Sequence, residues 1–153
     1  MNQMVQERGK RTAAASATSS APIDTVWNLV ATTESWPTWA SKMDRAERVR
    51  DGDASREGVG AQRSFHAGRV NSIEDVVEFD VPHRFAYSLV SGLPLKDYVG
   101  RITLSEVDGG TRIDWRSSFN PRFPGTGMIW QWGIRRLLRG MAADLARGAE
   151  RAV

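Results

Sequence analysis

The sequence predicts one α+β domain, in which a curved antiparallel sheet of about seven strands wraps around a long C-terminal helix. Apolar and polar residues alternate through much of the segment 43–119, which is typical of strands joined by short turns. An apolar stripe with helical spacing then covers residues 126–151. A sheet with one apolar face needs a cover, and only this helix is long enough to provide it.

Length and composition fit a single domain. The chain has 153 residues, enough to bury a core without a metal or a disulfide. Residues 1–11 are polar and lack the apolar stretch of a signal peptide, so we expect a flexible leader followed by one domain over 12–153. No apolar run approaches the roughly 20 residues that span a bilayer.

Charge and cysteine content exclude several classes of function. The net charge is +3 and the arginines are scattered among acids, whereas nucleic-acid-binding proteins gather such charge on one face, so we expect no nucleic-acid partner. The chain has no cysteine, which excludes disulfides, thiolate metal sites and thiol nucleophiles and fits a cytoplasmic location. A monomer and a homodimer are both compatible with the sequence.

The N-terminal part is expected to form one strand and two short helices. Small and polar residues over 12–20 form the first strand, and Pro22 stands where a first helical turn tolerates proline. Trp36 and Trp39 give the second helix a large apolar surface, and Pro37 limits its length. The first helix is amphipathic because its apolar residues recur at helical spacing, at Ile23, Val26, Trp27 and Val30.

Six strands should follow as an antiparallel meander, because no connection is long enough for a parallel crossover. Turn residues at 51–53 and 108–110 separate neighbouring strands. The predicted strands cover 43–50, 58–67, 70–80, 85–90, 97–107 and 111–119. Alternation places the following side chains on the face toward the helix: Phe85, Tyr87, Leu89, Ile113, Trp115, Ser117 and Phe119.

A loop rich in proline and glycine over 120–127 ends the sheet and leads into the long helix. At about 1.5 Å per residue this helix would be about 37 Å long, enough to cross a whole sheet. Its apolar face contains Trp130, Ile134, Leu137, Leu138, Met141, Leu145 and Ala149.

Three segments resemble a known family. APIDTVWNLVAT followed by ESWPTWASKM resembles the opening of the START-like (SRPBCC) superfamily, in particular its polyketide cyclase/dehydrase-like branch. VVEFDVPHRFAYSLV and GRITLSEVDGGTRIDWRSSF resemble the central and last hairpins of that branch. The resemblance covers nearly the whole chain after Arg11 and implies the helix-grip (Bet v 1-like) fold.

The resemblance also implies a cavity between sheet and helix for lipids, polyketides, hormones or other apolar ligands. It implies no single activity, since the superfamily includes cyclases, hydrolases, carriers and receptors. Binding of a hydrophobic or aromatic small molecule is therefore the first expectation, with no cofactor. The predicted ligand-contacting residues are Trp39, Phe85, Tyr87, Tyr98, Trp115, Phe119, Trp130, Ile134, Leu138 and Met141.

Three residues are candidates for acid–base chemistry: His66, Asp75 and Arg63. His66 could act as a general acid or base near neutral pH if its side chain faces inward. Otherwise it is a surface or hydrogen-bonded strand residue. Asp75 shares strand alternation with apolar neighbours, and burial would raise its pKa unless a cation such as Arg63 pairs with it. Glu74 and Glu78 have the opposite alternation and are expected to face solvent. No spacing typical of a metal site occurs, so no metal is expected.

Two alternative functions stay open beside binding. One is a cyclase/dehydratase- or hydrolase-type enzyme that uses His66, Asp75, Arg63 or a tyrosine. The other is a protein- or membrane-interaction module that uses exposed tryptophans and the arginines of the long helix, Arg135, Arg136 and Arg139. The loop 91–96 and the helix at Trp36 are expected to flank the mouth of the cavity, and the loop to act as a gate.

Overall fold

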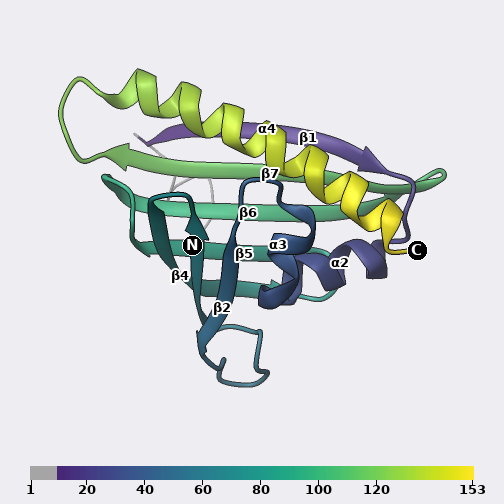
Figure 1. The fold of residues 1–153 in the computed structure, drawn as a ribbon. Coiled ribbons are helices and arrows are strands. Elements are labelled where there is room, and N and C mark those ends of the chain that lie inside the picture. The colour runs from purple at the N-terminus through teal and green to yellow at the C-terminus, as the bar shows by residue number, and fades with distance from the viewer. Residues whose placement is uncertain (1–9) are drawn as a thin grey trace.

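The computed structural model describes residues 10–153, and it contains the predicted sheet, short helices and long C-terminal helix (Figure 1). The predicted leader therefore lies mostly outside the described residues, and the first strand begins at Arg11. The elements are β1 (Arg11–Ser19), α2 (Ile23–Ala31), η1 (Thr33–Ser35), α3 (Trp36–Trp39), β2 (Arg45–Arg50), β3 (Gln62–Ala67), β4 (Val70–Asp80), β5 (Arg84–Ser91), β6 (Leu95–Val107), β7 (Gly110–Pro121) and α4 (Gly127–Arg151).

The sheet has seven strands in the order β1-β7-β6-β5-β4-β3-β2. All neighbouring strands are antiparallel, as the short connections predicted. The first strand pairs with the last one along its whole length, from Arg11 opposite Phe119 to Ser19 opposite Thr111. The predicted helix-grip architecture is thereby confirmed.

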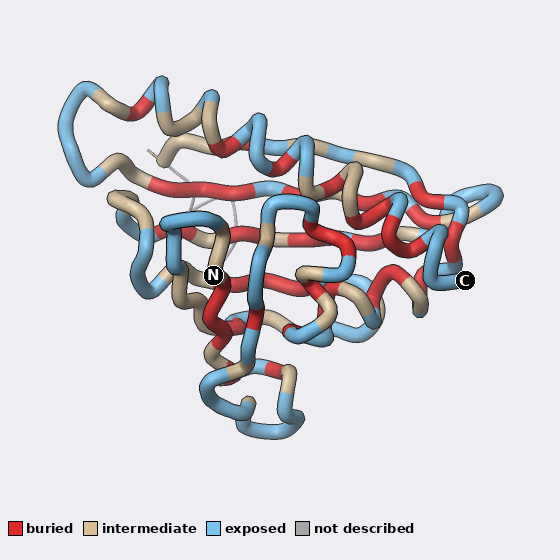
Figure 2. Tube along the Cα trace, viewed as in Figure 1, coloured by how far each residue is buried: buried red, intermediate tan, exposed pale blue. Residues whose placement is uncertain are grey.

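The long helix α4 lies across one face of this sheet, and α2 and α3 lie near its C-terminal end (Figure 1). The C-terminal half of α4 is the more deeply buried, because small residues there allow close contact. A Cβ at Gly148 would lie only 2.5 Å from Cβ of Trp39, so α3 and α4 meet almost backbone to backbone. Figure 2 shows more exposed chain along the N-terminal half of α4.

Strand β4 departs from simple alternation. Its register with β5 shifts between Ile73 and Glu74, and again between Val76 and Glu78. The second shift inserts Val77 as an extra residue, and this side chain is 46% exposed while Val76 is buried. Strict alternation would place Val77 on the same face as Phe79, but a bulge reverses the faces of all residues on one side of it.

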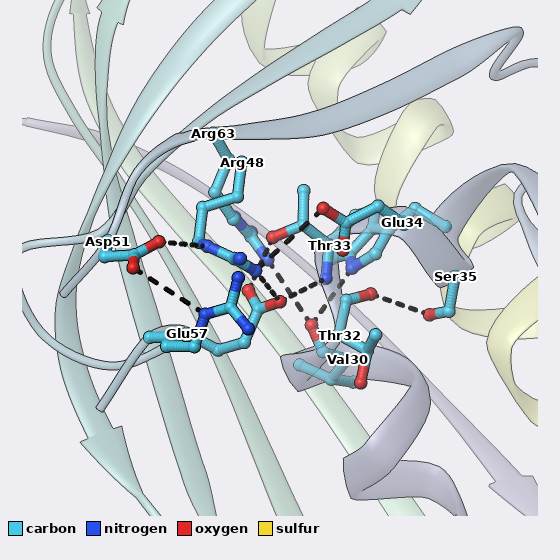
Figure 3. A network of polar contacts seen from close by, with 11 residues as sticks. Val30, Thr32, Thr33, Glu34, Ser35, Arg48, Asp51, Glu57 and Arg63 are labelled. Carbon is cyan, nitrogen blue, oxygen red and sulfur yellow. Dashed lines mark hydrogen bonds and ion pairs between the residues drawn. The ribbon is translucent and has the colours of Figure 1, made fainter.

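A polar network holds η1 against β2 (Figure 3). Arg48 donates from Nη1 to Glu57 at 2.6 Å and from Nε to Asp51 at 2.8 Å. Glu57 in turn accepts a hydrogen bond of 2.7 Å from the hydroxyl of Thr33. The hydrogen bond from Arg48 to Asp51 raises the pKa of the Arg48 guanidinium and lowers the pKa of Asp51. These contacts fix the start of α3, which carries Trp36 toward the core.

Within residues 10–153, no helix is both long enough and apolar enough to cross a membrane.

Candidate functional site

A cavity of about 250 Å³ lies between α4 and the strands β3 to β6. Most of its lining is apolar, and its polar groups come from Ser72, Glu74 and the two tyrosines. The residues that line it are Trp36, Met43, Phe65, Ala67, Val70, Ser72, Glu74, Tyr87, Leu89, Leu93, Tyr98, Leu137, Leu138 and Met141. A mostly apolar hollow with few polar groups is typical of sites for small organic molecules.

A second hollow of about 290 Å³ adjoins this cavity at the surface. Both hollows are lined by the same four residues, which form the boundary between them: Met43, Ala67, Leu137 and Met141. The outer hollow also contains Lys42, Arg136 and Arg147, with Asp144 as its one acid. Asp144 accepts hydrogen bonds from Ser41 and Arg147, and these bonds lower the pKa of its carboxyl although burial opposes them.

The cavity contains part of the predicted contact set. Tyr87, Tyr98, Leu138 and Met141 line the cavity. Leu93 lines it from the loop expected at its mouth, and Trp36 lines it from α3. The other predicted residues do not line it: Phe85, Trp115, Phe119 and Ile134 are buried in solid core, Trp39 packs on Trp36, and Trp130 is half-buried against the core.

Arg63 is fully buried, with none of its surface exposed. Its guanidinium carbon lies 4.9, 4.9 and 4.6 Å from the ring centroids of Trp36, Phe65 and Phe85, so three aromatic faces surround the cation. Its Nη1 donates to the carbonyl of Val30 at 3.4 Å, as Figure 3 shows. Its Nε has no hydrogen-bond partner. Burial lowers the pKa of Arg63.

The counterion of Arg63 is Glu74, at 3.4 Å between Nη2 and Oε1. This separation is longer than the roughly 2.7–2.9 Å of a strong charge-assisted hydrogen bond. The Glu74 side chain is only 14% exposed, and burial raises its pKa to about 7 even though Arg63 acts in the opposite direction. The cavity therefore contains a carboxyl group that changes protonation near neutral pH.

Two tyrosines lie beside this carboxyl group. Trp115 Nε1 donates to the hydroxyl of Tyr87 at 3.1 Å, and Tyr98 shares a hydrogen bond of 2.7 Å with Ser117. Burial raises the pKa of Tyr98 to about 12 and the pKa of Tyr87 well above its ordinary value, so both stay protonated at neutral pH. Gly100 makes room for the Tyr87 ring, since a Cβ at that position would overlap it.

The predicted acid–base candidates are not brought together. Asp75 faces away from the cavity, where its carboxylate accepts hydrogen bonds from Arg50 at 3.2 Å and Gln62 at 2.9 Å. The prediction that Asp75 shares the inner face was wrong for the same reason as at Val77, the shifted register of β4. His66 is half-buried outside the cavity, and its Nε2 lies 3.1 Å from Arg45 Nη2.

Glu74 is the functional candidate that sequence alternation missed. The prediction that it faces solvent was wrong, because it lines the cavity and pairs with Arg63. The adjacent valines Val76 and Val77 already interrupt strict alternation in this strand, and this pair is the signal that could have indicated a bulge. In the described part of the chain, no group of three or more His, Cys, Asp or Glu side chains could hold a metal ion.

Solved structures of similar shape are known. The chain aligns with a START superfamily protein from Mycobacterium smegmatis at a TM-score of 0.81 and 14% identity, covering 95% of this chain and 100% of the other. It aligns with the Zhui aromatase/cyclase from Streptomyces sp. R1128 at a TM-score of 0.79 and 16% identity, covering 93% and 94%. It aligns with a protein from Thermobifida fusca at a TM-score of 0.73 and 23% identity, covering 92% of this chain and 94% of the other. At these identities the likeness concerns the fold alone.

The family comparison is independent of this structural likeness. A search of curated proteins finds no match. Residues 10–150 match the family described as polyketide cyclase / dehydrase and lipid transport, which is nearly the whole chain. The match agrees with the resemblance of the three sequence segments. The chain therefore belongs to the family described as polyketide cyclase / dehydrase and lipid transport.

Proposed function

We propose that this protein binds a hydrophobic or aromatic small molecule, lipid- or polyketide-like, in the cavity between the sheet and α4. The observation that carries the proposal is the cavity of about 250 Å³, which is apolar except for Ser72, Glu74 and the two tyrosines. Burying apolar ligand surface yields about 2.5 kcal/mol per 100 Å², so a ligand of two or three rings would gain most of its affinity from the lining.

The polar groups support a preference within that class. Glu74, when protonated, can donate a hydrogen bond, and when ionised it can only accept one. The Tyr87 hydroxyl already accepts a bond from Trp115 and stays protonated. A ligand with a carbonyl or phenolic oxygen at one edge and a bare apolar body fits this distribution best. We therefore propose phenolic polycyclic compounds as the first probes.

Filling the cavity should abolish binding of such a probe. Leu89→Trp adds a large ring to the lining, whereas Val90→Trp adds the same ring at the next residue, which is exposed. We expect 1,8-dihydroxyanthraquinone to bind the Leu89→Trp variant at least about tenfold more weakly than the wild type, a loss equal to about 1.4 kcal/mol. Isothermal titration calorimetry would measure the affinity of the wild type and of both variants for this probe. Equal affinity of the wild type and the Leu89→Trp variant would place the ligand elsewhere.

A second candidate function is acid–base catalysis on the bound ligand. The observation that favours it is the pKa of about 7 of Glu74 inside the cavity, because a general base works best when its pKa is near the operating pH. In a dehydration, the Glu74 carboxylate would accept a proton from a carbon next to a carbonyl. The same proton would then pass to the departing hydroxyl, which leaves as water. Arg63 would act as a positioning residue, since it contacts Glu74 and does not line the cavity.

Proton exchange provides a test of this candidate that needs no natural substrate. The protein should accelerate the exchange of the α-protons of 2-tetralone in heavy water, measured by NMR, and Glu74→Gln should reduce that rate about 100-fold. Asp75→Asn, which changes the neighbouring carboxylate on the other face, is the matched control. Equal rates for wild type and Glu74→Gln would eliminate the enzyme candidate and leave the binding proposal intact.

A further inference from the structure

The large exposed hydrophobic residues are distributed unevenly over the surface. Among the described residues, those that are not valine all lie in one segment of the chain, 123–137. In α4, Met128, Ile129 and Trp132 are 74%, 71% and 63% exposed, and Phe123 is exposed in the loop before it. Figure 2 shows this loop and the outward side of the first turns of α4 as exposed. An apolar surface concentrated in this way is typical of an interaction site.

The wider stretch that contains this segment, residues 115–143, is basic. Residues 115–143 contain five arginines and neither aspartate nor glutamate. All five are exposed, and four of them lie in the loop before α4 or in α4 itself: Arg122, Arg135, Arg136 and Arg139. Two of them lie over exposed rings, Arg136 over Trp132 at 5.6 Å and Arg122 over Phe123 at 6.0 Å. The apolar and cationic groups therefore form one continuous surface.

The helix arranges these groups in order along its axis. With 3.6 residues per turn, the side chains 128, 129, 132, 135, 136 and 139 fall within about 120° of its circumference. The apolar ones occupy the first turns of α4 and the arginines follow directly behind them on the same side. We call this set, together with Arg122 and Phe123, the α4 stripe.

We propose that the α4 stripe docks this protein onto the surface of an anionic lipid bilayer. Exposed aromatic and aliphatic side chains at one end of the stripe would enter the interface between headgroups and acyl chains, and the arginines would contact anionic headgroups. Tryptophan and arginine are well suited to that boundary, because each has an apolar part and a polar end. Charge complementarity selects the bilayer, since the segment 115–143 contains no acid.

The same charges argue against a second copy of this chain as the occupant. In a twofold dimer the same surface meets itself, so Arg135 and Arg139 of one copy would face the identical arginines of the other. Nothing within the stripe neutralises them. The bilayer proposal goes beyond the proposed function and does not rest on it. Its link to the cavity is spatial, because Arg136 and Leu137 of the same helix segment line the outer hollow.

Vesicle flotation tests the proposal with the full chain and without any ligand. The wild type is expected to float with vesicles of phosphatidylcholine mixed with phosphatidylglycerol, to stay unbound with phosphatidylcholine alone, and to be released by high salt. Each arginine near an anionic surface contributes about fivefold in affinity, so Arg135→Ala with Arg139→Ala should weaken binding about 25-fold. Ile129→Glu should abolish it, because it removes an inserted side chain and adds a repelled charge.

Val77→Glu is the matched control, since Val77 is also exposed but lies on β4, away from the stripe. It should bind vesicles like the wild type, and circular dichroism should show all variants folded. Failure of the wild type to bind the anionic vesicles, or equal loss in Val77→Glu, overturns the proposal. Sedimentation equilibrium without lipid tests whether a second copy of this chain binds the α4 stripe instead. A wild-type dimer that Ile129→Glu converts to a monomer overturns the proposal in favour of a contact between copies.

Discussion

Replacing Arg63 with alanine is expected to lower the free energy of unfolding by about 3–5 kcal/mol, the cost of removing one partner of a buried ion pair. The guanidinium is fully buried and lies among three aromatic rings. Its removal leaves a void between those rings and leaves Glu74 without its counterion. Urea unfolding, followed by fluorescence and far-UV circular dichroism, would measure the change.

Two further variants separate the causes of that loss. Arg63→Met keeps most of the volume but still leaves Glu74 without its counterion, so it should recover only the part of the loss that comes from the void. Arg50→Ala removes an exposed arginine from the ion pair with Asp75, and should change stability by less than about 1 kcal/mol. If Arg63→Ala were as mild as Arg50→Ala, the buried arginine would have no structural role.

The stability of the wild type is expected to fall by about 3 kcal/mol as the pH rises from 4.5 to about 7, relative to Glu74→Gln, which has no carboxyl group to titrate there. The raised pKa means that between these two pH values the folded chain holds a proton on Glu74 that the unfolded chain has released. Rising pH therefore favours the unfolded chain, at about 1.4 kcal/mol per pH unit.

The measurement compares urea unfolding of the wild type and Glu74→Gln at several pH values between 4 and 8, a range chosen to bracket both pKa values. The difference in free energy of unfolding between the two proteins should be constant below the pKa that Glu74 has in the unfolded chain. It should level off again above about pH 7. Asp75→Asn serves as the control, because its carboxylate is bound to Arg50 on the other face. Parallel profiles for the wild type and Glu74→Gln would show that Glu74 titrates normally.

The elements of this fold could be predicted because each has a local signal. The Asp-Gly-Gly turn sets the last hairpin, and the apolar spacing of α4 identifies its contact face, in which Ile134, Leu138 and Leu145 are buried. The pairing of β1 with β7 was not determined by any local feature, since it joins segments about 100 residues apart. Among the sequence observations, only the family resemblance pointed to this pairing, through the helix-grip fold that it implies.

The candidate site was harder to predict because it depends on packing. Alternation correctly placed Phe85 and Trp115 on the inner face, but it could not show that their rings fill the space there while Tyr87 and Leu138 border a hollow. It also failed in β4, where one added residue exchanges the two faces. Whether a side chain fills a gap depends on neighbours from other strands, and periodicity within one strand contains no information about them.

The bulge at Val77 has an evolutionary consequence. Two carboxylates stand next to each other in β4, and the register of the strand alone decides which of them enters the cavity. An insertion or deletion of one residue at this point would exchange Glu74 for Asp75 inside the cavity while the surrounding fold stayed the same. Relatives with similar sequences could thereby acquire different chemistry through a single-codon length change, so alignments of this family should be read strand by strand around the bulge.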